Sequence, residues 1–280
     1  MSVSRTSPSS PSTPAPPVIF DLDGTLVDSE PLYYEAGRQV LAEHGVSGFT
    51  WEEHLRFLGV GTRETLRTLR AEYGIAAPVE QLLDEKNRVY LALAHRSVVA
   101  FPKMRRLAEL LAESGAALAV ASGSSRAAID AVLTGTGLAP LFPVRVSAEE
   151  VGRGKPAPDV FLEAARRLGA RPVDCVALED APAGAEAARR AGMRCVAVPS
   201  APTASPASPA SPAQSAPGAP AAPRSGDCAD GGGDCVDGHF GGDGFASAGL
   251  LFPGGQREFD PLRAYAWITD GASGAGDVAG

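Results

Sequence analysis

The sequence predicts an α/β fold in which a doubly wound parallel sheet carries an α-helical cap inserted after its first strand. Between residues 98 and 198, short apolar runs typical of buried strands alternate with helical stretches, the pattern that builds parallel sheets. Residues 31–97 instead carry helix patterns with no strand pattern between them. The length of 280 residues and the hydrophobic content of 44% suit one α/β domain with a smaller insert.

The first predicted strand, residues 18–20, ends in two carboxylates. Asp21 and Asp23 stand two residues apart and are followed by Gly24 and Thr25. Positions i and i+2 of an extended chain share a face, so both groups crowd the carboxyl end of the strand. Two like charges this close are unfavourable unless a cation or a shared proton compensates them. The segment is therefore either a strand running into an Asp-Gly turn or one side of a cation site.

A second strand pattern ends in small polar residues. The apolar run 117–121 is followed by Ser122 and Gly123, and a helix pattern covers residues 126–134. The N-terminus of a helix offers free N–H groups and a positive dipole end, which attract phosphate. Ser122 therefore stands at a place suited to phosphate binding, although Ser-Gly-Ser is also ordinary loop chemistry.

A lysine precedes the next helix pattern. Lys155 lies in the Pro-rich loop 154–159, and the helix pattern 160–168 follows, with Asp159 expected as its N-cap. Taken alone, Lys155 is either a solvated loop lysine or a cation placed for an anionic ligand.

The last motif is another pair of acids at a strand end. An apolar strand pattern after Asp174 runs into Glu179 and Asp180, and an Ala-rich helix pattern covers residues 185–190. Adjacent acids at a strand end are oxygen ligands of the kind that Mg²⁺ prefers, although an isolated Glu-Asp pair is more often a helix N-cap. Ligands of open α/β sheets bind beyond the carboxyl ends of the strands, where all four motifs fall.

In this order the four segments resemble the motifs of the haloacid dehalogenase-like (HAD) hydrolase superfamily. Residues 21–25 resemble its nucleophile motif D-x-D-G-T, and residues 26–32 are similar to its β-phosphoglucomutase-like branch. Residues 154–159 match the cationic motif G-K-P-x-P followed by an acid. The resemblance covers residues 18–198 and implies a Rossmann-like core with a helical cap.

The resemblance also implies a mechanism. The expected enzyme is a Mg²⁺-dependent phosphatase that hydrolyses a small sugar-like phosphate monoester, of a sugar, polyol or cyclitol, through an aspartyl-phosphate. Asp21 would be the nucleophile and Asp23 the general acid and base. Ser122 and Lys155 would stabilise the phosphoryl oxygens. The expected metal ligands are Asp21, Asp23 through its backbone carbonyl, Asp180 and Glu179.

The cap is expected over residues 31–97, between core segments 18–30 and 98–199. Its helix patterns cover residues 31–44, 50–58, 62–73 and 79–94. In the family that the chain resembles, the cap sets substrate choice, and hinges are expected near residues 28–31 and 95–101. The expected substrate-binding residues are Tyr33, Arg63, Lys86, Asn87 and Gly123.

Tyr33 departs from the pattern D-S-E-P-L-H of the β-phosphoglucomutase-like branch, in which the sixth residue is histidine. A tyrosine hydroxyl, with a pKa of about 10, is poorly suited to proton exchange at neutral pH. This favours the phosphatase over the alternative, a sugar-phosphate mutase. A 2-haloacid dehalogenase would not need Asp23 or magnesium, and a non-catalytic interaction protein would be expected to lose a motif.

Several regions have compositions that cannot bury a core. Residues 1–17 are rich in Ser, Pro and Thr, and residues 200–245 are Ala/Pro/Ser-rich and then Gly/Asp-rich. We expect a disordered tail and a disordered insertion there. The core is expected to resume at residues 246–269, with a strand near 248–252 and a helix at 259–268. Residues 270–280 are expected to form a flexible tail.

Composition also limits the partners and the location. The formal charge of −8 argues against nucleic acid, so the expected partner is a small phosphate ester. The N-terminus lacks the apolar core of a secretory signal and no run is long enough to span a membrane, so we expect a cytoplasmic enzyme and a monomer. A metal site at Cys228, Cys235 and His239 is disfavoured, because its setting is Gly/Asp-rich and lacks a second ligand pair.

Overall fold

A computed structural model describes residues 15–57, 62–200 and 242–270 of the chain. Within these ranges, six parallel strands form the central sheet in the order β5-β4-β1-β6-β7-β8. The strands are β1 (Val18–Phe20), β4 (Leu118–Ser122), β5 (Val144–Ser147), β6 (Val176–Glu179), β7 (Arg194–Ala197) and β8 (Leu250–Leu251). The strand order runs outward from β1 in both directions, which confirms the predicted doubly wound parallel sheet.

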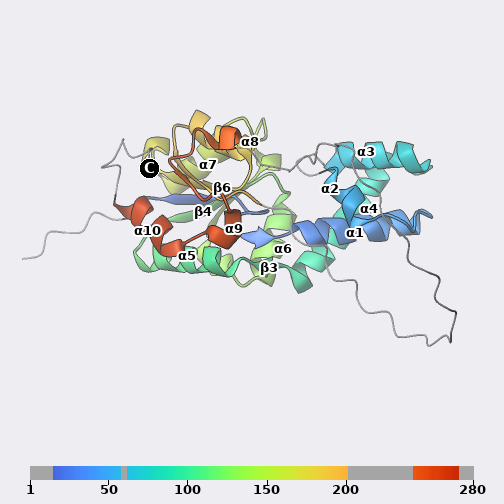
Figure 1. Cartoon of the computed structure of the whole chain (residues 1–280), viewed down its shortest axis with the longest axis horizontal. Coiled ribbons are helices and arrows are strands. Elements are labelled where there is room, and N and C mark those ends of the chain that lie inside the picture. Colours follow the sequence, from blue (N-terminus) through green and yellow to red (C-terminus); the bar gives the residue numbers. More distant parts are fainter. Residues whose placement is uncertain (1–14, 58–61, 201–241, 271–280) are drawn as a thin grey trace, which may run out of the picture.

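Helices cover both faces of the sheet (Figure 1). One face carries α5 (Pro102–Glu113), α6 (Arg126–Gly135) and α10 (Pro261–Thr269), and the other carries α7 (Asp159–Leu168) and α8 (Pro182–Arg190). Val18 and Phe20 of β1 join the apolar cluster of α5, α6 and α10, and Ile19 joins the cluster of α7 and α8. Because β1 is buried on both faces, its sequence is continuously apolar.

The described residues between β1 and α5 include four helices, which make up the cap. They are α1 (Glu30–Glu43), α2 (Trp51–Leu55), α3 (Thr62–Tyr73) and α4 (Val79–Ser97). The cap lies to one side of the sheet (Figure 1) and has an apolar cluster of its own, which includes Val40, Leu41, Leu66, Leu69 and Leu82. An amphipathic helix is stable only when its apolar face is buried, and this cluster buries the inner faces of α1, α3 and α4.

The side chain of Thr50 caps the start of α2, whereas no side chain caps α7. The hydroxyl of Thr50 accepts the backbone N–H of Glu53, whose carboxylate accepts the N–H of Thr50, so a capping box begins α2. The prediction that Asp159 is the N-cap of α7 is wrong, because Asp159 is the first residue of the helix and Pro158 is the N-cap. The carboxylate of Asp159 pairs instead with the guanidinium of Arg153 (3.1 Å).

The connection between cap and core contains an antiparallel pair that the sequence did not predict. β2 (Val27–Asp28) pairs with β3 (Val99–Ala100), and the backbone N–H of Phe101 donates to the carbonyl of Leu26 (3.0 Å). The two segments predicted as hinges are therefore bonded to each other. Two-residue strands are too short to carry a periodic pattern, which explains why they were missed.

The chain packs on the core at both borders of the regions predicted to be disordered. Residues 1–14, 201–241 and 271–280 lie outside the described residues, as do Cys228, Cys235 and His239. Before β1, the carbonyl of Pro17 accepts the backbone N–H of Val176 (3.0 Å). After the insertion, residues 242–245 form a 3-10 turn, and Phe245 is buried in the cluster of α7 and α8. The core contacts therefore begin before residue 18 and resume before residue 246.

β8 follows this turn and pairs with β7 in parallel, which agrees with the strand predicted near residues 248–252. The short helix α9 (Gly255–Glu258) then leads to α10. α10 begins at Pro261, because the carboxylate of Asp260 accepts the N–H groups of Leu262 and Arg263. Among the described helices, none has the length and apolar character needed to cross a membrane.

Truncation of Phe245 tests where the chain returns to the core. Phe245 is 5% exposed, whereas Leu262 on α10 is 65% exposed. Phe245→Ala should lower the free energy of unfolding by about 3 kcal/mol, because it removes a buried ring. The matched change Leu262→Ala should alter it by less than about 0.5 kcal/mol. Urea unfolding followed by circular dichroism measures both, and equal effects would contradict the packing of Phe245.

Candidate active site

The carboxyl ends of β1, β4 and β6 meet at one edge of the sheet. The register places Phe20 opposite Leu178 of β6, and Asp21 donates its backbone N–H to the carbonyl of Leu178 (2.9 Å). Ser122 is the last residue of β4, and Glu179 is the last residue of β6. Three of the predicted site residues are thus brought together by strand pairing.

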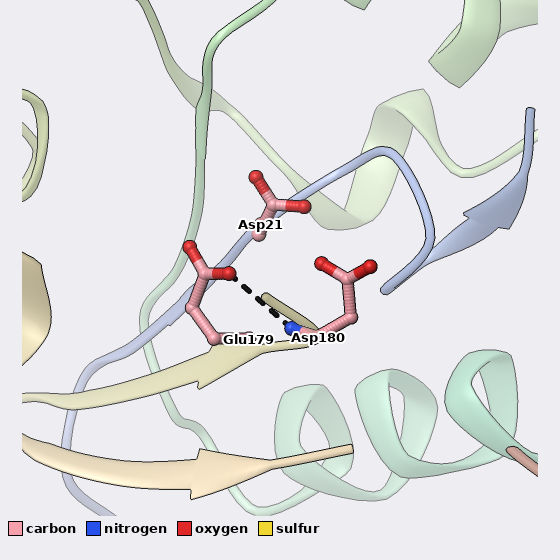
Figure 2. Close-up of side chains that lie close together, drawn as sticks. All are labelled: Asp21, Glu179 and Asp180. Atoms are coloured by element: carbon pink, nitrogen blue, oxygen red, sulfur yellow. Dashed lines mark hydrogen bonds between the residues drawn. The ribbon is translucent and has the colours of Figure 1, made fainter. Parts of the chain in front are cut away.

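Asp21, Glu179 and Asp180 form an acidic group at this edge (Figure 2). One carboxylate oxygen from each lies within 4.8 Å of the others. Asp21 and Glu179 are buried, and Oε2 of Glu179 accepts the backbone N–H of Asp180 (3.2 Å). Carboxylate oxygens are the donors that hard divalent cations prefer, so this group could hold a metal ion.

Two glycines let the backbone approach the acidic group closely. Gly24 has a φ of +81°, and a Cβ there would lie 2.2 Å from Oδ2 of Asp180. A Cβ at Gly184, in α8, would lie 1.9 Å from Cδ of Glu179. Both distances are far inside van der Waals contact, so any other residue would displace the carboxylate. Thr25 adds a hydrogen bond from its hydroxyl to Oδ1 of Asp180 (3.3 Å).

Lys155 is the cation of the site. It reaches the acidic group from the loop before α7, and its Nζ donates to Oδ1 of Asp21 (2.6 Å) and to the carbonyl of Ala121 (3.0 Å). Nζ also forms an ion pair with Oε1 of Glu179 (2.6 Å). Burial alone would lower the pKa of Lys155, but Asp21 and Glu179 outweigh that effect and raise the pKa. The lysine is therefore held as an ammonium ion between two carboxylates.

One ammonium does not balance three carboxylates. Burial raises the pKa of Glu179 to about 7, although Lys155 opposes the shift. Burial, with repulsion from Asp21 and Glu179, raises the pKa of Asp180 well above its usual range. Carboxylates that are costly to ionise together are typical of a site that binds a divalent cation, which favours their charged forms.

The side chain of Asp23 has different partners from the acidic group. Its Oδ2 accepts hydrogen bonds from the hydroxyls of Ser124 (2.6 Å) and Ser122 (3.4 Å), and its Oδ1 accepts one from Tyr90 (3.4 Å). Burial and the neighbouring charge of Asp21 raise the pKa of Asp23. Two aspartates two residues apart therefore have distinct surroundings, one paired with an ammonium and the other bound by hydroxyls.

Tyr33 and Tyr90 bring the cap to this network. Tyr33 lies on α1 and Tyr90 on α4, and their rings stack with centroids 4.4 Å apart. The hydroxyl of Tyr33 lies 3.0 Å from Oγ of Ser124. Burial raises the pKa of both tyrosines, so both hydroxyls keep their protons at neutral pH.

Lys86 is a second predicted cap residue beside this network. It is 7% exposed on α4, and its Nζ lies 5.5 Å from the centroid of the Tyr33 ring, a cation–π contact. Burial lowers the pKa of Lys86 to about 8, while Glu30 opposes the shift. Burying a lysine is costly, so its position beside Tyr33 is consistent with a role in binding an anionic or polar ligand.

The remaining predicted substrate residues have other surroundings. Arg63 is half-exposed and pairs with Glu80 of α4, so its charge is met within the cap. Asn87 is exposed on α4. Gly123 is exposed, and a Cβ at this position would meet no atom within 4 Å, so there is room above it. The substrate-binding roles of these three residues stay predictions.

Four residues of the site were not among the predicted site residues: Gly24, which was noted only as part of the D-x-D-G-T motif, Ser124, Tyr90 and Gly184. Ser124 was hidden within the Ser-Gly-Ser-Ser run, in which only the first serine matched a motif. Tyr90 lies one helical turn after Lys86, so helix spacing alone could have placed it beside that residue. The glycines matter because of tertiary contacts that no local pattern reveals.

Comparisons with known proteins identify the family. The family model for haloacid dehalogenase-like hydrolases matches residues 18–198. The bifunctional riboflavin kinase/FMN phosphatase of Arabidopsis thaliana is 35% identical over 65% of this chain, which spans about half (48%) of that relative. Fructose-1-phosphate phosphatase YqaB of Escherichia coli is 33% identical over 65% of this chain and 95% of its own length.

A solved structure is also similar to this chain in fold. The structure of CbbY from Rhodobacter sphaeroides in complex with phosphate superposes with a TM-score of 0.59 and 29% identity, covering 68% of this chain and 88% of that one. The matched residues 18–198 include β1, β4, β5, β6 and β7 and the motifs at the carboxyl ends of β1, β4 and β6, whereas β8 lies beyond them. The chain belongs to the haloacid dehalogenase-like hydrolase family.

Proposed function

We propose that this chain is a Mg²⁺-dependent phosphatase that hydrolyses a small sugar-like phosphate monoester through an aspartyl-phosphate. The observation that carries the proposal is the pair of aspartates with unlike surroundings. Asp21 lies in an acidic group beside Lys155, and Asp23 is bound by hydroxyls. A fructose-1-phosphate phosphatase among the relatives supports a sugar phosphate as the substrate class.

In the proposed reaction a carboxylate oxygen of Asp21 attacks phosphorus while the bond from phosphorus to the leaving oxygen breaks. Asp23 gives its proton to that leaving oxygen, so the product departs as an alcohol. Asp23 then takes a proton from water, whose oxygen attacks the phosphorus of the aspartyl-phosphate; the bond from phosphorus to the Asp21 oxygen breaks, which releases inorganic phosphate and regenerates the Asp21 carboxylate. The raised pKa of Asp23 supports its role as the proton carrier.

The acidic group fits Mg²⁺ because all its donors are carboxylate oxygens. Asp21, Asp180 and the backbone carbonyl of Asp23 would hold the ion, with Glu179 assisting. Bound Mg²⁺ neutralises negative charge on the phosphoryl group and on the carboxylates. Lys155 adds the second positive charge, and Ser122 would donate a hydrogen bond to a phosphoryl oxygen.

For the substrate itself, we infer that the cap contributes Lys86 and Tyr33, which lie beside the Asp23 network. Arg63, Asn87 and Gly123 would contact the substrate at its edge. A buried lysine with its pKa lowered to about 8 suits recognition of a polar or anionic group distant from the transferred phosphate. Sugar, polyol and cyclitol phosphates all fit this description, and their relative turnover identifies the substrate class.

Replacement of the nucleophile tests the proposed mechanism. Asp21→Asn should lower kcat on the order of 10³-fold or more, because the amide cannot form the aspartyl-phosphate. A chelator should abolish wild-type activity and added Mg²⁺ should restore it. Phosphate release measures both effects, and Asp84→Asn on the exposed face of α4 is the matched control. Substantial hydrolysis by metal-free protein would contradict the assignment.

A sugar-phosphate mutase is the second candidate, because it would share the same core and nucleophile. The two differ in whether water or a sugar hydroxyl attacks the aspartyl-phosphate. Tyr33 favours water, since it occupies the position of a histidine that exchanges protons in the mutase pattern. Given β-glucose 1-phosphate with a trace of glucose 1,6-bisphosphate, the enzyme should release phosphate faster than it forms glucose 6-phosphate. Assays of both products on one sample decide, and faster isomerisation would favour the mutase.

A further inference from the structure

Both carboxylate oxygens of Asp23 accept hydrogen bonds from hydroxyls. Ser124 donates to Oδ2 at 2.6 Å, and Tyr90 donates to Oδ1 at 3.4 Å. A serine hydroxyl has one proton, and here it is directed to Asp23. While Asp23 is ionised, the Tyr33 hydroxyl, 3.0 Å from Oγ of Ser124, is therefore the donor in that contact. The result is a chain of donors from Tyr33 through Ser124 to Asp23.

The donors come from both parts of the molecule. Ser124 belongs to the core loop between β4 and α6, whereas Tyr33 and Tyr90 belong to cap helices α1 and α4. The two rings stack at 4.4 Å, so the tyrosine hydroxyls are placed together rather than independently. Tyr90 is 4% exposed, which leaves its hydroxyl little contact with water. The orientation of the Asp23 carboxyl therefore depends on cap and core together.

We propose that Ser124, Tyr33 and Tyr90 are positioning residues that hold the Asp23 carboxyl in the orientation needed for proton transfer to the leaving oxygen. The inference deepens the proposed function and rests on it. An aspartate side chain that follows a strand end can rotate about two bonds, and proton transfer needs hydrogen-bond reach to the leaving oxygen. Donors on both oxygens remove that freedom, and the cap supplies one of them directly and another through Ser124.

The test separates orientation of the acid from a general structural role. The variants are Ser124→Ala, Tyr33→Phe and Tyr90→Phe, each of which removes a hydroxyl and little volume. Two substrates are compared by kcat/KM, which reports the steps up to departure of the leaving group. One is the sugar or polyol phosphate that the wild type turns over fastest, whose alkoxide needs a proton in order to leave. The other is p-nitrophenyl phosphate, whose phenolate leaves without one.

We expect each variant to lower kcat/KM for the alkyl phosphate about 10-fold or more, as partial loss of general acid catalysis predicts. The value for p-nitrophenyl phosphate should change less than about 3-fold, since its leaving group needs no acid. Asp23→Asn sets the upper limit of this contrast. Ser124→Thr keeps the hydroxyl and should restore the alkyl activity.

Matched controls lie close by. Tyr34→Phe removes a hydroxyl on α1 that donates to the carbonyl of Phe49, and Ser97→Ala removes one on α4 that donates to Leu93. Both variants should leave kcat/KM for the two substrates unchanged. Equal losses with both substrates, or an unchanged alkyl rate in Ser124→Ala and Tyr90→Phe, would overturn the inference. Failure of the wild type to hydrolyse either substrate with Mg²⁺ would instead overturn the proposed function.

Discussion

The ammonium of Lys155, enclosed between Asp21 and Glu179, is the interaction on which the arrangement of the site depends. It joins the loop before α7 to the ends of β1 and β6, two neighbouring strands from distant parts of the sequence. A buried ion pair contributes little to stability by itself, because removing charges from water is costly. Here the ammonium also leaves the three carboxylates only partly neutralised, and a divalent cation, as proposed above, would compensate this excess of negative charge.

Backbone geometry makes that concentration of charge possible. Parallel pairing aligns the ends of the central strands, so acids that are about 160 residues apart in the sequence reach the same edge without long loops. Gly24 then lets the turn after β1 come into van der Waals contact with Asp180, and Gly184 does the same for α8 and Glu179. The acidic group is built on the sheet, and Tyr33 and Tyr90 of the cap reach the neighbouring Asp23 network.

The sequence predicted the parts of the molecule that repeat a local pattern. Buried strands that end in acids were recognisable because burial on both faces makes β1 and β6 continuously apolar. The β2–β3 pair was not recognisable, because a strand of two residues is too short to show a hydrophobic alternation. Asp159 is of a residue type favoured at N-caps, but its carboxylate pairs with Arg153. The pairing of Arg63 with Glu80 depends on how α3 lies on α4. Such contacts are set by tertiary packing, which local spacing does not determine.

The departure at Tyr33 connects the cap to the choice between hydrolysis and transfer. A histidine at this position can gain and lose a proton near neutral pH, so its hydrogen bonds can switch during the reaction. Burial raises the pKa of Tyr33, so its hydroxyl stays protonated, and in the proposed network it donates to Ser124. In the proposed mechanism Asp23 would then keep one orientation whether the next acceptor is water or a sugar hydroxyl. Water is always present at high concentration, so hydrolysis is favoured if Asp23 is oriented as a base before a second sugar binds.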